Sequence, residues 1–314
     1  MSSLVSVIIP AHNAEKFILD TLLSVAAQTH SSFELIVVDD GSKDATSEIV
    51  RCFQDQRIRL FRTKGIGAAA ARNVGLAEAH GAFIQFLDAD DLLSPDKLAL
   101  QLSALRQNNE LLASCAWLPF IDTIDDAREF SEPVWTTEDT IAWQQQSMCG
   151  LGMMQTGCWL AHRSLIEKAG PWNESLTLHD DGEFFMRVML AAGRQVFVPD
   201  CCVYYRRVAG SLSRQRGTKA IKSAFEVCRL RTELLLQAEN SDASKSAAAT
   251  LWGQFAYEFC HSEPALVNCA MRHIELLRHS PRNNIGGGKF RFLCQWLGWK
   301  RAMSVRRLAG KRLL

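Results

Sequence analysis

Residues 58–91 read IRLFRTKGIGAAAARNVGLAEAHGAFIQFLDADD, and this stretch decides the fold class. A short apolar run at 58–61 leads into a glycine turn at 64–67, and the residues at 68–79 are mostly helix formers. A second apolar run at 83–87 then ends in three carboxylates within four positions. The succession of strand, turn, helix and strand is typical of the βαβ unit of a parallel sheet.

The preceding residues show the same alternation. Continuous β-branched runs at 5–10 (VSVIIP) and 33–40 (FELIVVDD) indicate strands that are buried on both faces. Apolar residues between these runs follow helical spacing, and a further helix is expected at 42–53. We therefore predict an α/β protein with a nucleotide-binding, mainly parallel sheet flanked by helices, plus a C-terminal helical appendage.

The chain changes in composition after the fourth predicted strand. Residues 218–280 are rich in Ala and Leu with helical periodicity, and three glycines at 286–288 interrupt the chain. We predict an α/β domain over 1–215, a helical extension over 216–283 and a basic amphipathic tail over 284–314.

The second half of the α/β domain has weaker patterns. We assign no regular element to 108–150, where tryptophans mix with turn residues and charges. The elements that we expect elsewhere are helices at 96–107, 164–168 and 183–192 and short strands at 196–198 and 203–205.

The composition indicates a globular protein of a reducing compartment. Hydrophobic residues make up 47% of the 314 residues, which is ample for a packed core. The ten cysteines show no C-x-x-C spacing, and the first residues include no basic leader, so we expect free thiols and a cytoplasmic location. No apolar run is long enough to predict a membrane span.

The carboxylates Asp88, Asp90 and Asp91 follow the strand at 83–87, at the strand end where open α/β sheets bind ligands. Neighbouring negative charges repel one another unless solvent, a cation or a proton relieves them. An Asp-x-Asp pair is suited to a divalent cation and the diphosphate oxygens attached to it. The alternative is a helix N-cap, which would contribute about 1 kcal/mol but would not account for Asp88.

A second acidic strand end lies at Asp39, whose carboxylate can accept hydrogen bonds from a base or a ribose. The alternative is that residues 40–44 only cap the next helix, and we expect Asp39 to be functional and the others to cap.

Residues 65–70 match the G-x-G-x-x-A fingerprint of NAD-binding proteins, with Asp88 about twenty positions later. The fingerprint follows the third strand instead of the first, and its acidic residue belongs to the Asp-x-Asp cluster. We therefore interpret Gly65 as part of a turn that lets the backbone approach a ligand, with Arg72 as its cationic partner.

Four ordered segments resemble the motifs of family 2 glycosyltransferases. They are VSVIIPAHN (5–13), VVDDGSKD (37–44), GAAAARNVGLAEAHGAFIQFLDADD (67–91) and HDDGEFFMRV (179–188). The resemblance covers residues 4–214 and implies an inverting enzyme of the GT-A fold. Because the chain lacks a Gln-x-x-Arg-Trp motif, the enzyme is expected to be non-processive.

The resemblance implies roles for individual residues. Asp39 matches the aspartate that binds the base, Asp88 is expected toward the ribose, and Asp90 toward the metal. Asp88 and Asp90 together form the predicted site for Mn²⁺ or Mg²⁺. The residues that match nucleotide-binding positions are Pro10, Ala11, His12, Glu15, Asp39, Gly65, Arg72, Asp88, Ala89, Asp90 and Arg206.

The fourth motif supplies a candidate catalytic base. Its Asp180 and Asp181 align with the family's Glu-Asp pair, which implies that Asp181 takes the proton of the acceptor hydroxyl. The alternative is that both residues cap the helix at 183–192. Gly182 stands where the family often has Trp, so we expect different contacts with the acceptor.

The segment YYRRVAGSLSR (204–214) resembles the family pattern Tyr-Arg-x-His-x-x-Ser-x-Ser. Arg206 fits this pattern and is predicted to contact diphosphate oxygens. Val208 stands in the position of the His, whose role Arg207 or Arg214 would have to take.

The tail is basic and aromatic. No acidic residue follows Glu275, and residues 276–314 carry ten Lys and Arg, whereas the rest of the chain has a net charge of −9. Aromatic and cationic side chains within 289–312 favour an anionic membrane surface as a partner. The alternative is an appendage that packs its tryptophans on the protein or on a second subunit. The acidic body argues against nucleic acid as a partner.

These features predict an inverting, metal-assisted transferase of the hexosyl or N-acetylhexosaminyl class. The donor would be a nucleotide-diphosphate sugar, and the acceptor a hydroxyl of a glycan or lipid-linked glycan. We expect the enzyme to work peripherally at the cytoplasmic face of a membrane. The alternatives are an NAD-dependent oxidoreductase and a catalytically inactive nucleotide-sugar-binding scaffold at the membrane.

Overall fold

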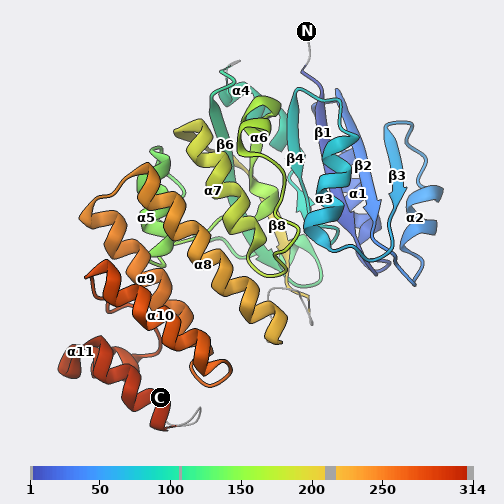
Figure 1. The fold of residues 1–314 in the computed structure, drawn as a ribbon. Coiled ribbons are helices and arrows are strands. Elements are labelled where there is room, and N and C mark those ends of the chain that lie inside the picture. The colour runs from blue at the N-terminus through green and yellow to red at the C-terminus, as the bar shows by residue number, and fades with distance from the viewer. Residues whose placement is uncertain (1–2, 106–107, 209–216, 310–314) are drawn as a thin grey trace.

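The computed structural model describes residues 3–105, 108–208 and 217–309, and its strands form one mixed sheet (Figure 1). Within these residues, eight strands pair in the order β3-β2-β1-β4-β7-β6-β8-β5. The strands are β1 (Val5–Ala11), β2 (Phe33–Asp39), β3 (Ile58–Arg62), β4 (Phe83–Phe86), β5 (Leu92–Leu93), β6 (Leu111–Phe120), β7 (Leu160–His162) and β8 (Arg194–Arg206). Strands β1 to β4 are parallel, and so are β6 and β8, whereas β7 and β5 pair antiparallel with their neighbours.

The helices alternate with the strands in the first half of the chain and follow one another in the last third. In chain order they are α1 (Ile18–Ala26), α2 (Thr46–Cys52), α3 (Ala68–Ala77), α4 (Lys97–Leu105), α5 (Thr140–Met148), α6 (Arg163–Ala169), α7 (Asp180–Ala192), α8 (Thr218–Ala238), α9 (Asp242–Phe259), α10 (Pro264–Leu277) and α11 (Gly288–Ala309). Two short 3-10 turns are η1 (Ile124–Asp126) and η2 (Thr156–Cys158).

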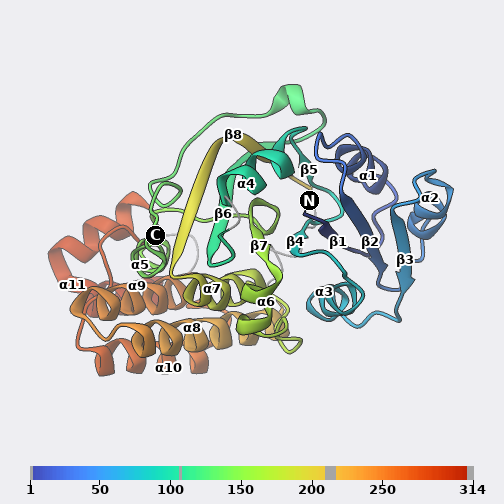
Figure 2. The ribbon, with the colours of Figure 1, turned by 90° about the horizontal axis from the view of Figure 1, so that it is seen from above.

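Helices cover both faces of the sheet, as Figure 2 shows from above. Helices α1 and α4 lie on one face, and α3, α6 and α7 lie on the other. Residues Ile36, Val37 and Val38 of β2 are all fully buried, as a continuous apolar run predicts for a strand covered on both sides. Helix α3 packs closely on β1, because a Cβ at Gly75 would collide with the side chain of Ile8. The predicted α/β architecture flanked by helices is confirmed.

The second half of the sheet differs from the prediction. Strand β6 lies in the segment to which we assigned no regular element, and the two short strands expected at 196–198 and 203–205 are one strand, β8. The pairing of β6 with β8 shifts register after Cys115, whose partner is Val198, so that the next pair is Ala116 and Cys202. The strand thus passes Pro199 through an irregularity that is typical of a β-bulge. All ten cysteines are free thiols, as predicted.

The predicted helical appendage is present and has its own apolar core. This core includes Trp252 and Phe255 of α9, but also Met148 of α5 and Met186 of α7. The extension is therefore packed on the α/β domain through α5 and α7.

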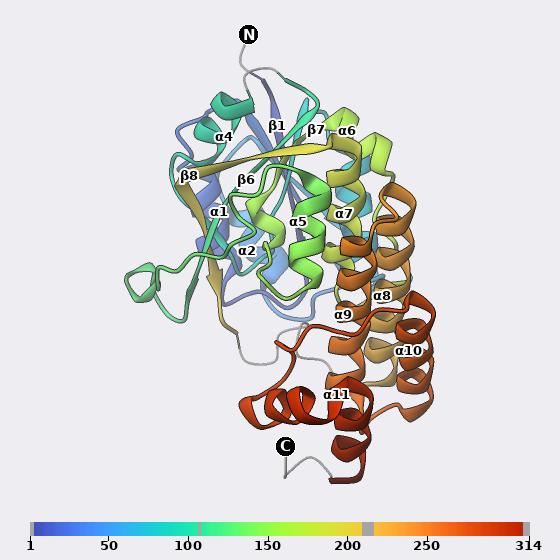
Figure 3. The ribbon, with the colours of Figure 1, turned by 90° about the vertical axis from the view of Figure 1, so that its left-hand side faces the viewer.

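Helix α11 lies at the end of the molecule opposite the N-terminus (Figure 3). It bends at Gly298, whose φ of 73° is a left-handed value that favours glycine. Phe290 and Trp299 are buried against the helical core, whereas Phe292 and Trp296 are 58% and 76% exposed.

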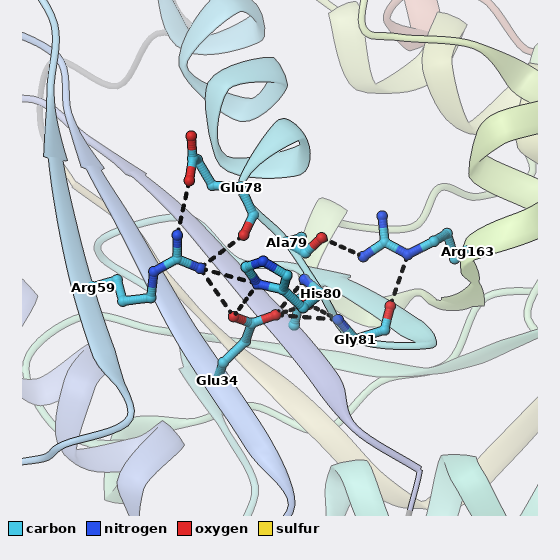
Figure 4. A network of polar contacts seen from close by, with 8 residues as sticks. Glu34, Arg59, Glu78, Ala79, His80, Gly81 and Arg163 are labelled. Carbon is cyan, nitrogen blue, oxygen red and sulfur yellow. Dashed lines mark hydrogen bonds and ion pairs between the residues drawn. The ribbon is translucent and has the colours of Figure 1, made fainter.

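A polar network joins the amino ends of the central parallel strands (Figure 4). The Glu34 carboxylate accepts hydrogen bonds from the Ser6 hydroxyl at 2.6 Å and from the backbone N–H groups of His80 and Gly81 at 2.5 and 3.1 Å. Its other oxygen lies 3.3 Å from the Arg59 guanidinium. Burial opposes the ionisation of Glu34, but the hydrogen bonds from Ser6 and His80 outweigh it and lower its pKa.

Candidate active site

The carboxyl ends of β1 and β2 meet at the opposite edge of the sheet, where Asp39 pairs in register with Ala11. Asp39 is fully buried and accepts hydrogen bonds from the Ser42 N–H at 2.9 Å and from the Ser47 hydroxyl, and Arg62 lies 3.3 Å away. Burial opposes the ionisation of Asp39, but these hydrogen bonds outweigh it and lower its pKa. Asp39 is therefore a fixed anion at the strand tip.

The residues after β1 are tied to the residues after β2. The Nδ1 atom of His12 lies 2.7 Å from the carbonyl oxygen of Asp40, and the Glu15 carboxylate accepts a hydrogen bond from the Ala45 N–H at 3.0 Å. The predicted nucleotide-binding residues that this arrangement gathers beside Asp39 are Pro10, Ala11, His12 and Glu15.

Asp40 holds the glycine turn that precedes α3. Its carboxylate accepts hydrogen bonds from the Thr63 hydroxyl at 2.5 Å and from the N–H groups of Ile66 and Gly67, each at 2.7 Å. In dinucleotide-binding proteins, the backbone of such a turn approaches the pyrophosphate instead. A carboxylate at this position would repel a pyrophosphate, which argues against the NAD-dependent oxidoreductase. The expectation that Asp40 caps the next helix is wrong.

The acidic cluster after β4 is only partly neutralised by the protein. Burial and the Asp88 carboxylate raise the pKa of Asp90 to about 6. Asp91 is 1% exposed and accepts the N–H of Arg206 at 3.0 Å, yet burial and Asp90 raise its pKa well above the usual value. The cluster therefore carries more negative charge than its surroundings offset, and a cation would relieve it.

Arg72 joins the two acidic motifs. One guanidinium nitrogen donates to Asp88 at 2.8 Å and another donates to Asp180 at 2.9 Å. The guanidinium lies 4.4 Å from the centroid of the Trp172 ring, and the side chain is only 7% exposed. Segments that are far apart in the sequence are thus held around one buried cation from α3.

Asp181 lies in the first turn of α7. The helix begins at Asp180, earlier than expected, after His179 adopts a left-handed conformation with a φ of 59°. Asp180 and Asp181 are therefore inside the helix, and the alternative that they cap a helix at 183–192 is wrong. Burial and the adjoining Asp180 carboxylate raise the pKa of Asp181 to about 6, a value that suits a general base near neutral pH.

Arg206, at the end of β8, is bound to protein groups. It donates from Nε to the Asp90 carbonyl oxygen at 3.0 Å and from Nη2 to the Asp20 carboxylate at 2.9 Å, and it lies 4.5 Å from the centroid of the Phe120 ring. Its contact with diphosphate oxygens stays a prediction, and these bonds already give it a role in fixing the acidic loop. Arg214 lies outside the described residues.

The carboxylates present fit a divalent cation. Asp88 and Asp90 offer hard oxygen ligands, and a cation would relieve the repulsion that, together with burial, raises the pKa of Asp90. The part of the chain that the structure describes contains no group of three His, Cys, Asp or Glu side chains placed to hold a metal ion. A cation at Asp88 and Asp90 would therefore take its other ligands from diphosphate oxygens and water, as Mg²⁺ commonly does.

Two side chains at the site were missed from the sequence. Trp172 follows the Gly170-Pro171 break, and nothing in the local sequence predicts that its ring lies beneath Arg72. Arg231 of α8 lies near Gly182, and nothing distinguishes it in the sequence from Arg229 two positions earlier. Both contacts depend on how the helices pack.

Comparisons with known proteins agree with this geometry. Residues 6–170 match the family described as Glycosyl transferase family 2. An uncharacterized glycosyltransferase of Rickettsia felis is 44% identical over 114 residues, which are 36% of this chain and 19% of that protein. WfgD of Escherichia coli, a UDP-Glc:alpha-D-GlcNAc-diphosphoundecaprenol beta-1,3-glucosyltransferase, is 46% identical over 107 residues, which are 34% of this chain and 42% of that protein.

A solved structure is similar over nearly the whole chain. TarS 1–349 of S. aureus in complex with UDP-GlcNAc has a TM-score of 0.71 at 21% identity, covering 96% of this chain and 90% of that one. This likeness confirms the predicted GT-A fold.

The family match covers just over half of the chain, so the chain belongs to glycosyl transferase family 2. The chain spans less than half the length of the two sequence relatives named above. Among residues 3–105, 108–208 and 217–309, no helix combines the length and the apolar character needed to cross a membrane.

Proposed function

We propose that this protein transfers a hexosyl or N-acetylhexosaminyl group from a UDP-sugar to a hydroxyl of a glycan or lipid-linked glycan, with inversion at the anomeric carbon. The observation that carries the proposal is the guanidinium of Arg72, which binds both Asp88 and Asp180 and so places the Asp-x-Asp motif beside the candidate base. The uridine nucleotides in the descriptions of TarS and WfgD support a UDP-sugar as the donor.

In this proposal the nucleotide lies across the carboxyl ends of β1 and β2. The buried carboxylate of Asp39 receives hydrogen bonds from the base. The His12 ring stacks on the base. Asp88 faces the ribose. Arg72 supplies positive charge near the diphosphate, because its guanidinium lies between the two acidic motifs.

Asp181 is the proposed general base. Its carboxylate takes the proton of the acceptor hydroxyl while the hydroxyl oxygen forms a bond to the anomeric carbon from the face opposite the leaving group. The bond between that carbon and the diphosphate oxygen breaks, and its electron pair stays on UDP. Attack from the opposite face inverts the configuration of the anomeric carbon.

A divalent cation, Mn²⁺ or Mg²⁺, would be held by Asp90 and Asp88. When bound, it would supply positive charge that stabilises the leaving diphosphate. The chain's own contribution is to keep these carboxylates close together, through the bonds of Arg206 to Asp90 and of Arg72 to Asp88.

We also propose that residues 289–312, of which 310–312 lie outside the described residues, bind an anionic membrane surface at the cytoplasmic face. Phe292 and Trp296 are exposed on α11, where their rings lie 5.7 Å apart, and Lys289 and Arg301 of the same helix are also exposed. Helix α11 lies at the end of the molecule opposite the N-terminus. The parallel strands also point toward this end (Figures 1 and 3). Sedimentation with phosphatidylglycerol vesicles tests this contact, which we expect the double substitution Phe292→Ser and Trp296→Ser to abolish.

Calorimetric titration of UDP with and without Mn²⁺ tests the donor site. We expect UDP to bind and Mn²⁺ to strengthen its binding. Asp90→Asn should remove the effect of Mn²⁺ and leave the fold intact. NAD binding without UDP binding would refute the proposal. A protein that binds UDP-sugars but neither transfers nor hydrolyses them would be the inactive scaffold.

A further inference from the structure

We infer that Arg231, on α8 of the helical extension, forms an anion-binding site beside the candidate base and recognises a phosphate group of the acceptor. The inference rests on the proposed function, because it takes Asp181 as the base that the acceptor hydroxyl must approach.

The position of Arg231 beside Gly182 is the geometric basis. A Cβ built on Gly182 would lie 3.6 Å from Nη1 of Arg231, so the guanidinium lies next to the space above this glycine. Gly182 directly follows Asp181, whose carboxylate accepts the Gly182 N–H at 2.8 Å. Nη2 of Arg231 donates to the Gln144 side chain of α5 at 2.9 Å, which fixes the direction of the guanidinium.

Arg231 differs from the other arginines of the site in its partners. Arg72 and Arg206 each have carboxylate partners within 3 Å. Arg231 has no carboxylate within ion-pair distance among the described residues. Its buried Nε atom has no hydrogen-bond partner there, a feature that it shares with Arg72. A buried cation that lacks an ion-pair partner is costly, and an anionic ligand that pairs with it lowers that cost.

The positive charge of Arg231 is not balanced by an ion pair with a protein group. Burial lowers its pKa, and the neighbouring groups that oppose this effect are the Cys228 thiol and Asp181. The charge of Asp180 is already met by Arg72. Arg231 as a whole residue is partly exposed, although its Nε atom is buried.

The acceptor is the substrate that reaches this position. Donor diphosphate is expected at Arg72, Asp88 and Asp90, whereas Arg231 belongs to α8 and lies beside Gly182. A guanidinium matches the oxygens of a phosphate with two parallel hydrogen bonds. A phosphorylated sugar would thus place its hydroxyl at Asp181 and its phosphate at Arg231.

Inorganic phosphate is the probe for this site. The full chain is saturated with UDP and Mg²⁺, which fills the donor site, and phosphate is then titrated calorimetrically. We expect Arg231→Met to weaken phosphate binding by roughly tenfold or more, with UDP affinity unchanged. Arg229→Met is the matched control, because Arg229 lies on the same helix and pairs only with Glu226 and Glu233 among the described residues.

Substitutions at Gly182 give a second reading of the same site. Gly182→Ala adds a Cβ at an ordinary contact distance from Arg231 and should leave phosphate binding intact. Gly182→Leu would displace the guanidinium and should weaken phosphate binding as Arg231→Met does. The inference is overturned if phosphate binds Arg231→Met as tightly as the unaltered protein, or if UDP binds and phosphate does not. If UDP itself fails to bind, the proposed function fails first.

Discussion

Glu34 at the amino edge of the parallel sheet and the pair Asp90 and Asp181 at its carboxyl edge are in opposite electrostatic situations. At the amino edge, the Glu34 carboxylate is bound by Ser6, Arg59 and the backbone before β4, and its pKa is lowered. At the carboxyl edge, burial and neighbouring carboxylates raise the pKa of Asp90 and of Asp181 to about 6.

This difference separates a carboxylate whose partners all come from the protein from carboxylates that are left beside one another. Asp39, at the carboxyl edge, belongs with Glu34 in this respect, because its pKa is also lowered. The charges around Glu34 at the amino edge are bound by groups of the protein once the chain has folded, so they need no ligand. The carboxyl edge is left with repulsion that a cation, a nucleotide or a proton can relieve, and such unrelieved charge is typical of active sites. Substitutions at the amino edge should therefore affect stability, and substitutions at the carboxyl edge should affect activity.

The largest effect is expected at the candidate base. Asp181→Asn should lower kcat by about 10²- to 10⁴-fold, because the amide cannot take the acceptor proton. The measurement is the release of UDP from a UDP-sugar in the presence of acceptor. Glu34→Gln makes the same chemical change at the other edge and should leave kcat unaltered. Full activity of Asp181→Asn would show that another group is the base.

At the amino edge, Glu34→Gln should lower the free energy of unfolding by about 1–3 kcal/mol. The amide nitrogen of Gln cannot accept hydrogen bonds, so one of the donors around Glu34 loses its partner. Urea denaturation measures the loss. An unchanged midpoint and slope would mean that this network contributes nothing to stability, and the comparison of the two edges would then fail.

A stabilising effect is expected from Asp90→Asn in the ligand-free protein. Removing a half-buried charge beside Asp88 should raise the free energy of unfolding at pH 7 by about 1–2 kcal/mol. The same substitution should abolish the additional thermal stabilisation that Mn²⁺ gives to the UDP complex. If the ligand-free variant is less stable than the unaltered protein, Asp90 is not repelled by its surroundings.

The last prediction concerns pH, where Glu34 should act with the opposite sign to Asp90 and Asp181. The folded pKa of Asp90 and Asp181, about 6, lies above the ordinary value of 3.8, so these groups contribute stability that is present below about pH 4 and lost as the pH rises to 6. The lowered pKa of Glu34 contributes stability that is present above the ordinary value of 4.5 and lost on acidification.

Denaturation of the ligand-free protein between pH 4 and pH 7 measures this balance. The stability of the unaltered protein should fall across that range by about 1–2 kcal/mol for each of Asp90 and Asp181. The double substitution Asp90→Asn and Asp181→Asn should remove this fall. An identical pH profile for the two proteins would contradict the raised pKa values.

The sequence was sufficient for the first half of the sheet and for the edge that carries the site. Strands β1 to β4 are unbroken apolar runs with helical patterns between them, so local periodicity identifies them. Because parallel strands end at one edge, the order of the residues alone places Asp39 and Asp88 on the same side of the sheet. The roles of these residues in binding a nucleotide stay predictions.

The remaining features depend on contacts between distant segments. Apolar and polar residues alternate only weakly in β6, and Pro199 interrupts the pattern of β8. Neither segment therefore has a local sequence pattern that predicts its full length as a strand. The bond of Arg72 to Asp180 and the approach of Arg231 to Gly182 follow from the docking of α7 and α8. No spacing rule in the sequence encodes such packing.

Helix α7 has a consequence for how the chain can be shortened. Its first turn carries Asp181, and farther along Met186 is buried in the apolar core that α8, α9 and α10 complete. A truncation after residue 215 would expose that core surface on the very helix that holds the base. We expect such a fragment to aggregate on expression, and the shortest soluble active fragment to extend beyond α10.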